Sequence, residues 1–191
     1  MFNITLEDKT IFQKVFETLK EFTSIVNISF DDEKMYIESM DDSHVCLILF
    51  NCKKSFFKSF NIEKKCVIGI NINSFVKILK SLNSKSSCEL SYNGETLEIS
   101  SEDKSFSLVL LNIDSEFLDI PDVEYKMKIT MNTKEVIDCF KDLTIHNSEE
   151  FKIFQTNNNM VWESRTEDGN VKKIWKNKEE NIVDMFNKMN L

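Results

Sequence analysis

The sequence predicts an α+β fold built from repeated βαβββ units, on three observations. A short strand, a polar capping residue and an amphipathic helix recur, with helices beginning near Thr10, Asn73 and Thr133, about sixty residues apart. Between the helices, apolar and polar residues alternate as they do in half-buried strands. The composition, 41% hydrophobic with 16 Phe, is sufficient for a packed core. Each unit is therefore expected to contribute one helix and a set of short strands.

Apolar residues spaced three and four apart predict one helix in each repeat. Asn73 or Ser74 is expected to cap the second helix, and Asn132 or Thr133 the third, because such side chains accept hydrogen bonds from free N–H groups. The apolar stripes are Ile11, Phe12, Val15, Phe16, Leu19 and Phe22 in the first helix, Phe75, Ile78, Leu79 and Leu82 in the second, and Val136, Ile137, Phe140 and Leu143 in the third.

Strands are predicted where apolar residues alternate with polar ones. One short strand is expected before each helix, and the three strands begin at Phe2, Cys66 and Tyr125. Asn93-Gly94 predicts a hairpin with a type I′ turn. The strands expected after the helices cover residues 24–30, 34–40 and 44–50 in the first repeat, 88–100 and 106–113 in the second, and 151–156, 160–164 and 170–176 in the third.

Residues 114–124 interrupt the repeat with several acids and the only proline, Pro121. This composition is typical of a linker. We therefore expect a first domain over residues 1–113 with two units, a connector over 114–124, and a shortened second domain over 125–191. The second domain would hold one unit and a tail, residues 179–191, that is expected to form a short helix.

The composition excludes several classes of protein. No apolar run approaches the length of about 18 residues that spans a bilayer, and the N-terminus does not resemble a secretion signal, so an intracellular protein without a membrane partner is expected. The five cysteines contain no CxxC pair and are expected to be reduced core residues. His44 and His146 lie far apart in the sequence, and no phosphate-binding loop is present, so neither a metal site nor a cofactor is expected.

The stretch MDDSHVCLILF, residues 40–50, has two interpretations. Asp41, Asp42 and His44 could begin a metal or acid/base site, which would make the chain an enzyme. Alternatively, the acids form a turn that leads into a strand. The first interpretation is the weaker one because no further ligand set occurs at a recognisable spacing, so no catalytic residue is expected.

Lysines recur on the polar sides of the predicted helices. The first helix carries Lys14 and Lys20, the second Lys77 and Lys80, and the third Lys134 and Lys141. The net charge of −8 argues against a protein that is basic all over. These lysines are either solvated helix faces or a shared surface that contacts phosphates without reading sequence.

Several stretches resemble the proliferating cell nuclear antigen (PCNA) family of DNA sliding clamps. MDDSHV, residues 40–45, is similar to the family's Met-Asp-Ser-Ser-His-Val motif, and ETLKEF, KILKSL, LDIPDVEY and DGNVKKIWK are similar to further family segments. The similarity runs from Met1 to about Lys176. It implies a DNA-clamp (processivity) fold with helices on one face of antiparallel sheets, in which three of the family's usual four units are present.

The resemblance also implies a function without catalysis. Family members form homo-oligomeric rings, usually trimers, around duplex DNA, are placed there by a clamp loader, and recruit polymerases and repair proteins through short hydrophobic motifs. The expected location is the nucleus or a viral replication site. The residues at the matching positions are Met40, His44, Val45, Leu47, Leu118, Ile120, Pro121 and Tyr125 for the partner groove; Lys14, Lys20, Lys77, Lys80, Lys134 and Lys141 for DNA; and Ser107, Val109, Leu111, Val171, Lys173 and Trp175 for the subunit interface.

The family's fourth unit has no counterpart in these 191 residues. The chain is then either a natural short or viral-type relative that assembles differently, or an incomplete product of a longer chain. Two functions follow. The first is a sliding clamp that encircles or contacts DNA, and the alternative is a clamp-derived scaffold that does not encircle it, such as a viral replication or transcription accessory factor.

Overall fold

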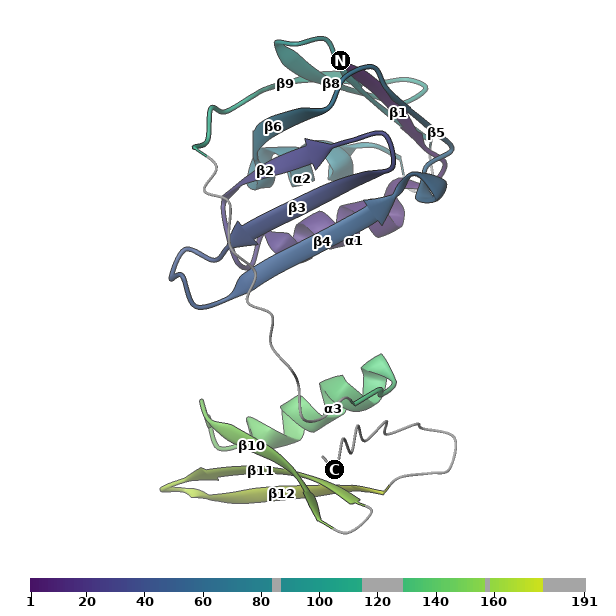
Figure 1. The fold of residues 1–191 in the computed structure, drawn as a ribbon. Helices are drawn as coiled ribbons and strands as arrows, with labels where there is room; N and C mark the ends of the chain where they lie inside the picture. The colour runs from purple at the N-terminus through teal and green to yellow at the C-terminus, as the bar shows by residue number, and fades with distance from the viewer. Residues whose placement is uncertain (84–86, 115–128, 157–158, 177–191) are drawn as a thin grey trace, which may run out of the picture. The chain divides into compact units, whose positions relative to one another are not determined.

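The computed structural model describes residues 1–83, 87–114, 129–156 and 159–176, and the chain divides into two compact units, Met1–Ile120 and Pro121–Leu191 (Figure 1). No helix among these described residues is long and apolar enough to cross a membrane.

The first unit contains two antiparallel sheets, with strand orders β5-β1-β7-β8-β9 and β4-β3-β2-β6. The two repeats exchange their first strands, because β1 of the first repeat pairs with β7 of the second, and β6 of the second pairs with β2 of the first. The elements are β1 (Phe2–Leu6), α1 (Lys9–Leu19), β2 (Ile25–Phe30), β3 (Lys34–Met40), β4 (Leu47–Lys53), the 3-10 helix η1 (Lys54–Phe56), β5 (Ser59–Ile62), β6 (Cys66–Asn71), α2 (Ile72–Ser81), β7 (Cys88–Tyr92), β8 (Thr96–Ser100) and β9 (Ser105–Val109).

Helices α1 and α2 pack together on one side of the β4-β3-β2-β6 sheet (Figure 1). Their contact is aromatic. The rings of Phe16 and Phe75 lie 4.7 Å apart in a T-shaped arrangement, and Phe12 lies 4.9 Å from Phe16. All three side chains are buried, so these members of the predicted apolar stripes form the centre of the core. Ile11 and Phe22 were predicted for the same stripe and are exposed, because Ile11 faces away from the core and α1 ends at Leu19, before Phe22.

Each of the three α-helices begins at a polar cap. The side chains of Asp8, Asn71 and Asn132 accept hydrogen bonds from main-chain N–H groups in the first turns of α1, α2 and α3. The prediction of Asn132 is confirmed, whereas Asn73 or Ser74 as the cap of α2 is wrong. Ile72 is fully buried and occupies the first helical position, so the helix starts earlier than the stripe alone indicated.

Three local predictions are corrected. The strand expected to begin at His44 begins at Leu47, because a turn occupies residues 41–46. The Asn93-Gly94 turn is not type I′: Gly94 has a positive φ of 111°, but Asn93 does not. The Asn93 side chain instead accepts hydrogen bonds from the N–H groups of Glu95 and Thr96. The edge strand β5, which pairs with β1, was not predicted.

The second unit contains α3 (Thr133–Leu143) and a sheet of β10 (Phe151–Thr156), β11 (Asn159–Thr166) and β12 (Gly169–Lys176), in that order. The buried residues of its core are Cys139, Leu143, Met160 and Trp162. Residues 129–132 are not in a strand, contrary to expectation, while residues 125–128 of that predicted strand and the predicted tail helix lie outside the described residues.

Candidate functional site

The turn between β3 and β4 is organised by one carboxylate. Asp41 Oδ1 accepts hydrogen bonds from the N–H groups of Val45 (2.8 Å) and Cys46 (2.6 Å), and Oδ2 accepts one from Ser43 (3.2 Å). These bonds, that from Cys46 first, lower the pKa of Asp41 below its usual range. The carboxylate is therefore committed to the main chain of its own turn.

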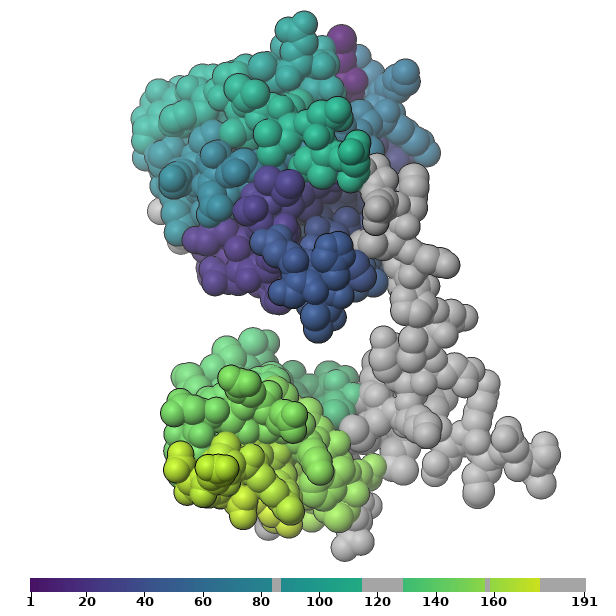
Figure 2. All heavy atoms as spheres, turned by 90° about the vertical axis from the view of Figure 1, so that its left-hand side faces the viewer, coloured from purple at the N-terminus to yellow at the C-terminus, as the bar shows by residue number. Residues whose placement is uncertain are grey.

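The structure gives the enzyme interpretation of Asp41, Asp42 and His44 no support. His44 has a positive φ of 57°, and its N–H donates to the carbonyl of Asp41, so it is part of the same turn. Over the described ranges, no group of three His, Cys, Asp or Glu side chains is placed to hold a metal ion. The turn projects from the first unit toward the viewer in Figure 2.

A hollow of about 470 Å³ lies beside this turn, on the outer face of the β4-β3-β2-β6 sheet. Its wall is partly apolar, with polar groups at intervals, which is the composition of sites for short peptides or small ligands. The lining side chains come from β2, β3 and β6, from the turn, and from the start of the predicted connector. Among them are Ile25, Tyr36, Glu38, Met40, His44, Val67 and Ile113.

The chain that leaves β9 is attached to the sheet before it reaches the hollow. Leu111 N–H donates to the carbonyl of Gly69 (2.8 Å), and Asn27 Nδ2 donates to the carbonyl of Ile113 (3.1 Å). The approach requires glycine, because a Cβ at position 69 would lie 2.3 Å from the carbonyl oxygen of Leu111. Asn27 and Gly69 thus position the segment that forms one wall of the hollow.

The predicted groove residues differ in whether they line the hollow. Met40 and His44 line the hollow, and Leu47 pairs directly with Met40 across β3 and β4. Val45 does not line it and is 86% exposed. The connector residues Leu118, Ile120, Pro121 and Tyr125 lie outside the described residues.

The predicted DNA-facing lysines are all exposed, five on their helices and Lys20 at the C-cap of α1, and Lys80 is paired with an acid. Lys80 of α2 forms an ion pair with Glu17 of α1 at 3.1 Å. Glu17 also accepts a hydrogen bond from Gln13 (2.9 Å), and Gln13 accepts one from the buried Lys9 (2.7 Å). The bond from Gln13, followed by that from Lys80, lowers the pKa of Glu17. The prediction from sequence missed Glu17, although the spacing of four between Lys9, Gln13 and Glu17 is a signal for such a row.

The predicted interface segments lie on β9 and β12, each the last strand of its sheet. In β9, Ser107 and Val109 are exposed, and Leu111 follows the strand. In β12, Val171 and Trp175 pack against the core of the second unit, and Lys173 forms an ion pair with Asp142 of α3. Unpaired strand edges of this kind are available for pairing with another chain.

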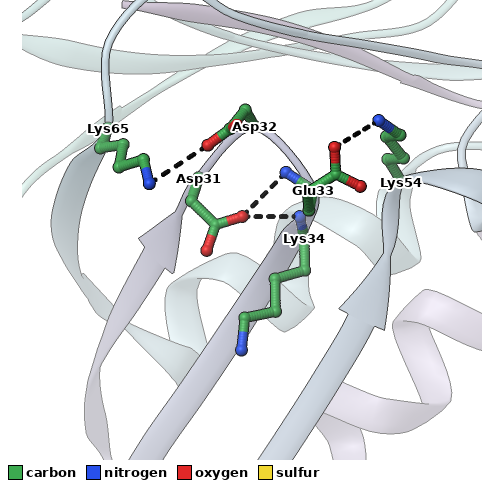
Figure 3. A network of polar contacts seen from close by, with 6 residues as sticks. All are labelled: Asp31, Asp32, Glu33, Lys34, Lys54 and Lys65. Atoms are coloured by element: carbon green, nitrogen blue, oxygen red, sulfur yellow. Dashed lines mark hydrogen bonds and ion pairs between the residues drawn. The ribbon is translucent and has the colours of Figure 1, made fainter.

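A second cluster of charges lies at the turn between β2 and β3 (Figure 3). Asp31 Oδ1 accepts hydrogen bonds from the N–H groups of Glu33 and Lys34, while Glu33 pairs with Lys54 at 2.6 Å and Asp32 with Lys65 at 3.2 Å. All three acids are therefore engaged by main-chain N–H groups or lysines of the same chain. They stabilise the turn and are not arranged as a ligand site, and such exposed ion pairs contribute little to stability.

Comparisons with known proteins agree with this architecture. The family model described as the N-terminal domain of proliferating cell nuclear antigen matches residues 1–135. The crystal structure of PCNA from Thermococcus kodakaraensis is similar with a TM-score of 0.88 over 96% of this chain and 76% of that chain, at 20% sequence identity.

Two curated relatives are similar in sequence. Proliferating cell nuclear antigen 2 of Plasmodium falciparum is 37% identical over 142 residues, which cover 67% of this chain and 54% of the relative. Probable DNA polymerase sliding clamp 2 of Paramecium bursaria Chlorella virus 1 is 29% identical over 145 residues, covering 75% of this chain and 55% of the relative. The chain spans about half the length of these relatives.

The protein therefore has the DNA-clamp fold, and the predicted α+β class with βαβββ repeats is confirmed. The chain belongs to the proliferating cell nuclear antigen family.

Proposed function

We propose that this chain is the subunit of a DNA sliding clamp, or polymerase processivity factor, that acts without catalysis in the nucleus or at a viral replication site. The observation that carries the proposal is the set of exposed lysines on the packed helices α1 and α2, in a chain whose net charge is −8. Lys14, Lys20, Lys77 and Lys80 form this set, named here the α1/α2 lysines.

The α1/α2 lysines suit a partner that is recognised by its phosphates. Lysine ammonium groups neutralise phosphates without reading bases, which gives a salt-sensitive and sequence-independent affinity. Such an affinity permits movement along duplex DNA. Lys134 and Lys141 of α3 would add to this contact, although Glu135, Asp138 and Asp142 on the same helix reduce its positive charge.

Charge reversal tests the proposed DNA contact. The double variant Lys77→Glu/Lys80→Glu should bind duplex DNA weakly, and the slope of log affinity against log salt should fall by about 0.9 for each phosphate that a lysine no longer neutralises. Lys58→Glu/Lys64→Glu is the control with the same change of net charge, because both lysines are exposed and lie outside α1 and α2. Fluorescence anisotropy at several salt concentrations gives the affinity and the salt slope of each variant. Equal losses of affinity and slope in the two variants would indicate only a general charge effect.

Glu17 should moderate the same contact, because it competes with DNA phosphates for Lys80. Glu17→Gln should raise affinity for duplex DNA by roughly two- to five-fold, the range expected for releasing an exposed ion pair. Glu21→Gln, at an exposed position just after α1, is the matched control and should have a smaller effect. If both variants gain the same affinity for duplex DNA in the anisotropy titration, the ion pair between Glu17 and Lys80 has no specific role.

The hollow beside the Asp41 turn is proposed to receive clients with short hydrophobic motifs. Met40 lines it from β3, and Ile113 lines it from the segment held by Asn27 and Gly69. Leu47, Leu118, Ile120, Pro121 and Tyr125 would complete the groove by family resemblance. DNA polymerases are the first partners to test, and a clamp loader is the expected assembly factor.

Met40→Ala should weaken a peptide that carries one aliphatic and one aromatic anchor by about five- to ten-fold, since it removes part of an apolar contact worth roughly 1 to 2 kcal/mol. Leu49→Ala is the control, because Leu49 is exposed on the neighbouring strand and does not line the hollow. Isothermal titration with each variant gives the affinities. A client whose affinity is unchanged by Met40→Ala binds elsewhere.

A clamp-derived scaffold that contacts DNA without encircling it is the second candidate function. The small core of the second unit favours it, since the described part has one helix over a three-stranded sheet. Light scattering after gel filtration separates the candidates, because a ring requires several chains. A particle with the mass of one chain at micromolar concentration would favour the scaffold.

A further inference from the structure

The floor of the hollow contains a carboxylate in the middle of a strand. Met35 and Ile37 of β3 are buried in the core. The alternate side chains of Tyr36, Glu38 and Met40 therefore lie on the opposite face of the sheet, where all three line the hollow. Glu38 is half-buried there, between an aromatic and an apolar side chain. Partly burying a carboxylate costs free energy unless a donor or a cation meets it.

The neighbours of Glu38 across the sheet are neutral. Leu49 of β4 stands directly opposite Glu38. On the other side, the amide nitrogen of Asn27 of β2 already donates to the carbonyl of Ile113. Among the residues that the structure describes, Glu38 has no hydrogen-bond or ion-pair partner. Its charge is therefore available to a group that enters the hollow.

The ring next to Glu38 already attracts a cation. The ammonium group of Lys34 lies 4.7 Å from the centroid of the Tyr36 ring and donates to Asn51 Oδ1 at 3.4 Å. Lys34 stands four residues before Glu38 on β3, about 13 Å away along the strand, so it is held at the ring instead of at Glu38. An aromatic ring and a carboxylate side by side attract the same kind of group.

The remaining charges of the hollow have the same sign. Asp41, Asp42 and Asp114 also line it, and no lysine or arginine occurs among its described lining residues. An anionic ligand would be repelled by this wall. A metal ion is not expected, because the described ranges contain no group of three His, Cys, Asp or Glu side chains placed to hold one. The charge of the hollow therefore fits an organic cation.

We propose that the clients of this hollow carry an arginine beside their apolar anchors, and that this arginine binds Glu38 and stacks on Tyr36. The inference rests on the proposed client site and specifies its chemistry. Arginine fits better than lysine, because its planar guanidinium donates two parallel hydrogen bonds to a carboxylate and stacks on an aromatic ring. Alternate residues of a strand are about 7 Å apart, so the arginine should stand within two or three residues of the anchor that contacts Met40.

A series of peptides tests this inference. All carry the same aliphatic and aromatic anchors. The reference peptide has glutamine at every other position, and each further peptide has one arginine at one of the positions within three residues of the aliphatic anchor. Isothermal titration of the full 191-residue chain should show about five-fold tighter binding than the reference at one of these positions.

The ratio of the two affinities, arginine peptide against reference peptide, is then measured in variants. Glu38→Gln should lower this ratio from about five to about one, because the amide keeps the shape of the side chain and loses its charge. Glu63→Gln is the matched control and should keep the ratio, since Glu63 is exposed and does not line the hollow. An equal ratio in Glu38→Gln and the unaltered chain overturns the proposal, because the arginine is then attracted by the general acidity of the protein.

Reversing the charge provides a second test. Glu38→Lys should bind a peptide with glutamate at the selected position more tightly than the arginine peptide, whereas a preference that stays with arginine overturns the proposal. The two levels of the account fail differently. A chain that binds the reference peptide but gains nothing from arginine at any position overturns this inference alone. A chain that binds none of the peptides overturns the proposed client site as well.

Discussion

Replacing Phe16 with alanine should lower the free energy of unfolding of the first unit by about 4 kcal/mol, the typical effect for a fully buried phenylalanine. Phe16 has no exposed surface and packs its ring against Phe12 and Phe75, so it joins α1 to α2 at the centre of the core. The neighbouring rings are themselves buried on α1 and α2, so the space it leaves is expected to remain a cavity. The pairing of the two helices, and with it the placement of the α1/α2 lysines, depends on this contact.

The two units can be followed separately, because both tryptophans, Trp162 and Trp175, belong to the second. Phe16→Ala should shift the urea transition seen by circular dichroism and leave the transition seen by tryptophan fluorescence unchanged. Phe56→Ala, at a phenylalanine that is 40% exposed, should cost less than about 1 kcal/mol. Similar destabilisation in the two variants would contradict the assignment of Phe16 to the centre of the core.

Replacing Gly69 with alanine should destabilise the first unit by about 2 to 3 kcal/mol, as overpacking does where the backbone must move. The added methyl group would meet the carbonyl oxygen of Leu111 at 2.3 Å, so the hydrogen bond between Leu111 and Gly69 cannot persist in its present geometry. The segment to Ile113 should move away from the sheet, and the wall of the hollow should move with it. Affinity for a client peptide should fall in the same variant.

Val67→Ala is the control for the change in stability only, because Val67 lies on the same strand with its side chain exposed but also lines the hollow. A destabilisation below about 1 kcal/mol is expected for it. Urea denaturation followed by circular dichroism gives both values. If Gly69→Ala is as stable as the unaltered chain, the backbone at Leu111 moves without cost, and position 69 does not hold the segment Leu111–Ile113 in place.

Much of the fold could be predicted from the sequence, because local pattern and tertiary contact agree in the first unit. Phe12, Phe16 and Phe75 recur at helical spacing and are the residues that the helices bury against each other. The two apolar periods, near 3.6 for helices and 2 for strands, therefore identified α1, α2 and most strands correctly. The start of α2 was misplaced because Asn71, its cap, also ends the preceding strand.

The local geometry of turns could not be predicted in this way. The Asp41 turn exists because one side chain bonds three N–H groups, and its residues continue the apolar pattern of the next strand, so the predicted strand began too early. Strand β5 has only four residues, Ser59–Ile62, and is formed by pairing with β1, a contact that no local pattern reveals.

The candidate surfaces were predicted unevenly for a related reason. The positions of Lys14, Lys20, Lys77 and Lys80 follow from helical periodicity, and all four are exposed as expected. The ion pair between Lys80 and Glu17 depends on how two helices cross, which sequence spacing does not specify. Likewise, the roles of Asn27 and Gly69 in holding Leu111 and Ile113 arise from a contact between distant segments.

The central claim, that the chain is a clamp subunit on duplex DNA, is tested most directly by comparing its release from circular and linear DNA. The protein is bound to a nicked circular duplex, separated from free protein by gel filtration, and the circle is then cut once with a restriction enzyme. A sliding clamp should remain on the closed circle and leave after the cut, because retention is topological and the phosphate contacts are weak. Release at the same rate before and after the cut would contradict the sliding-clamp function.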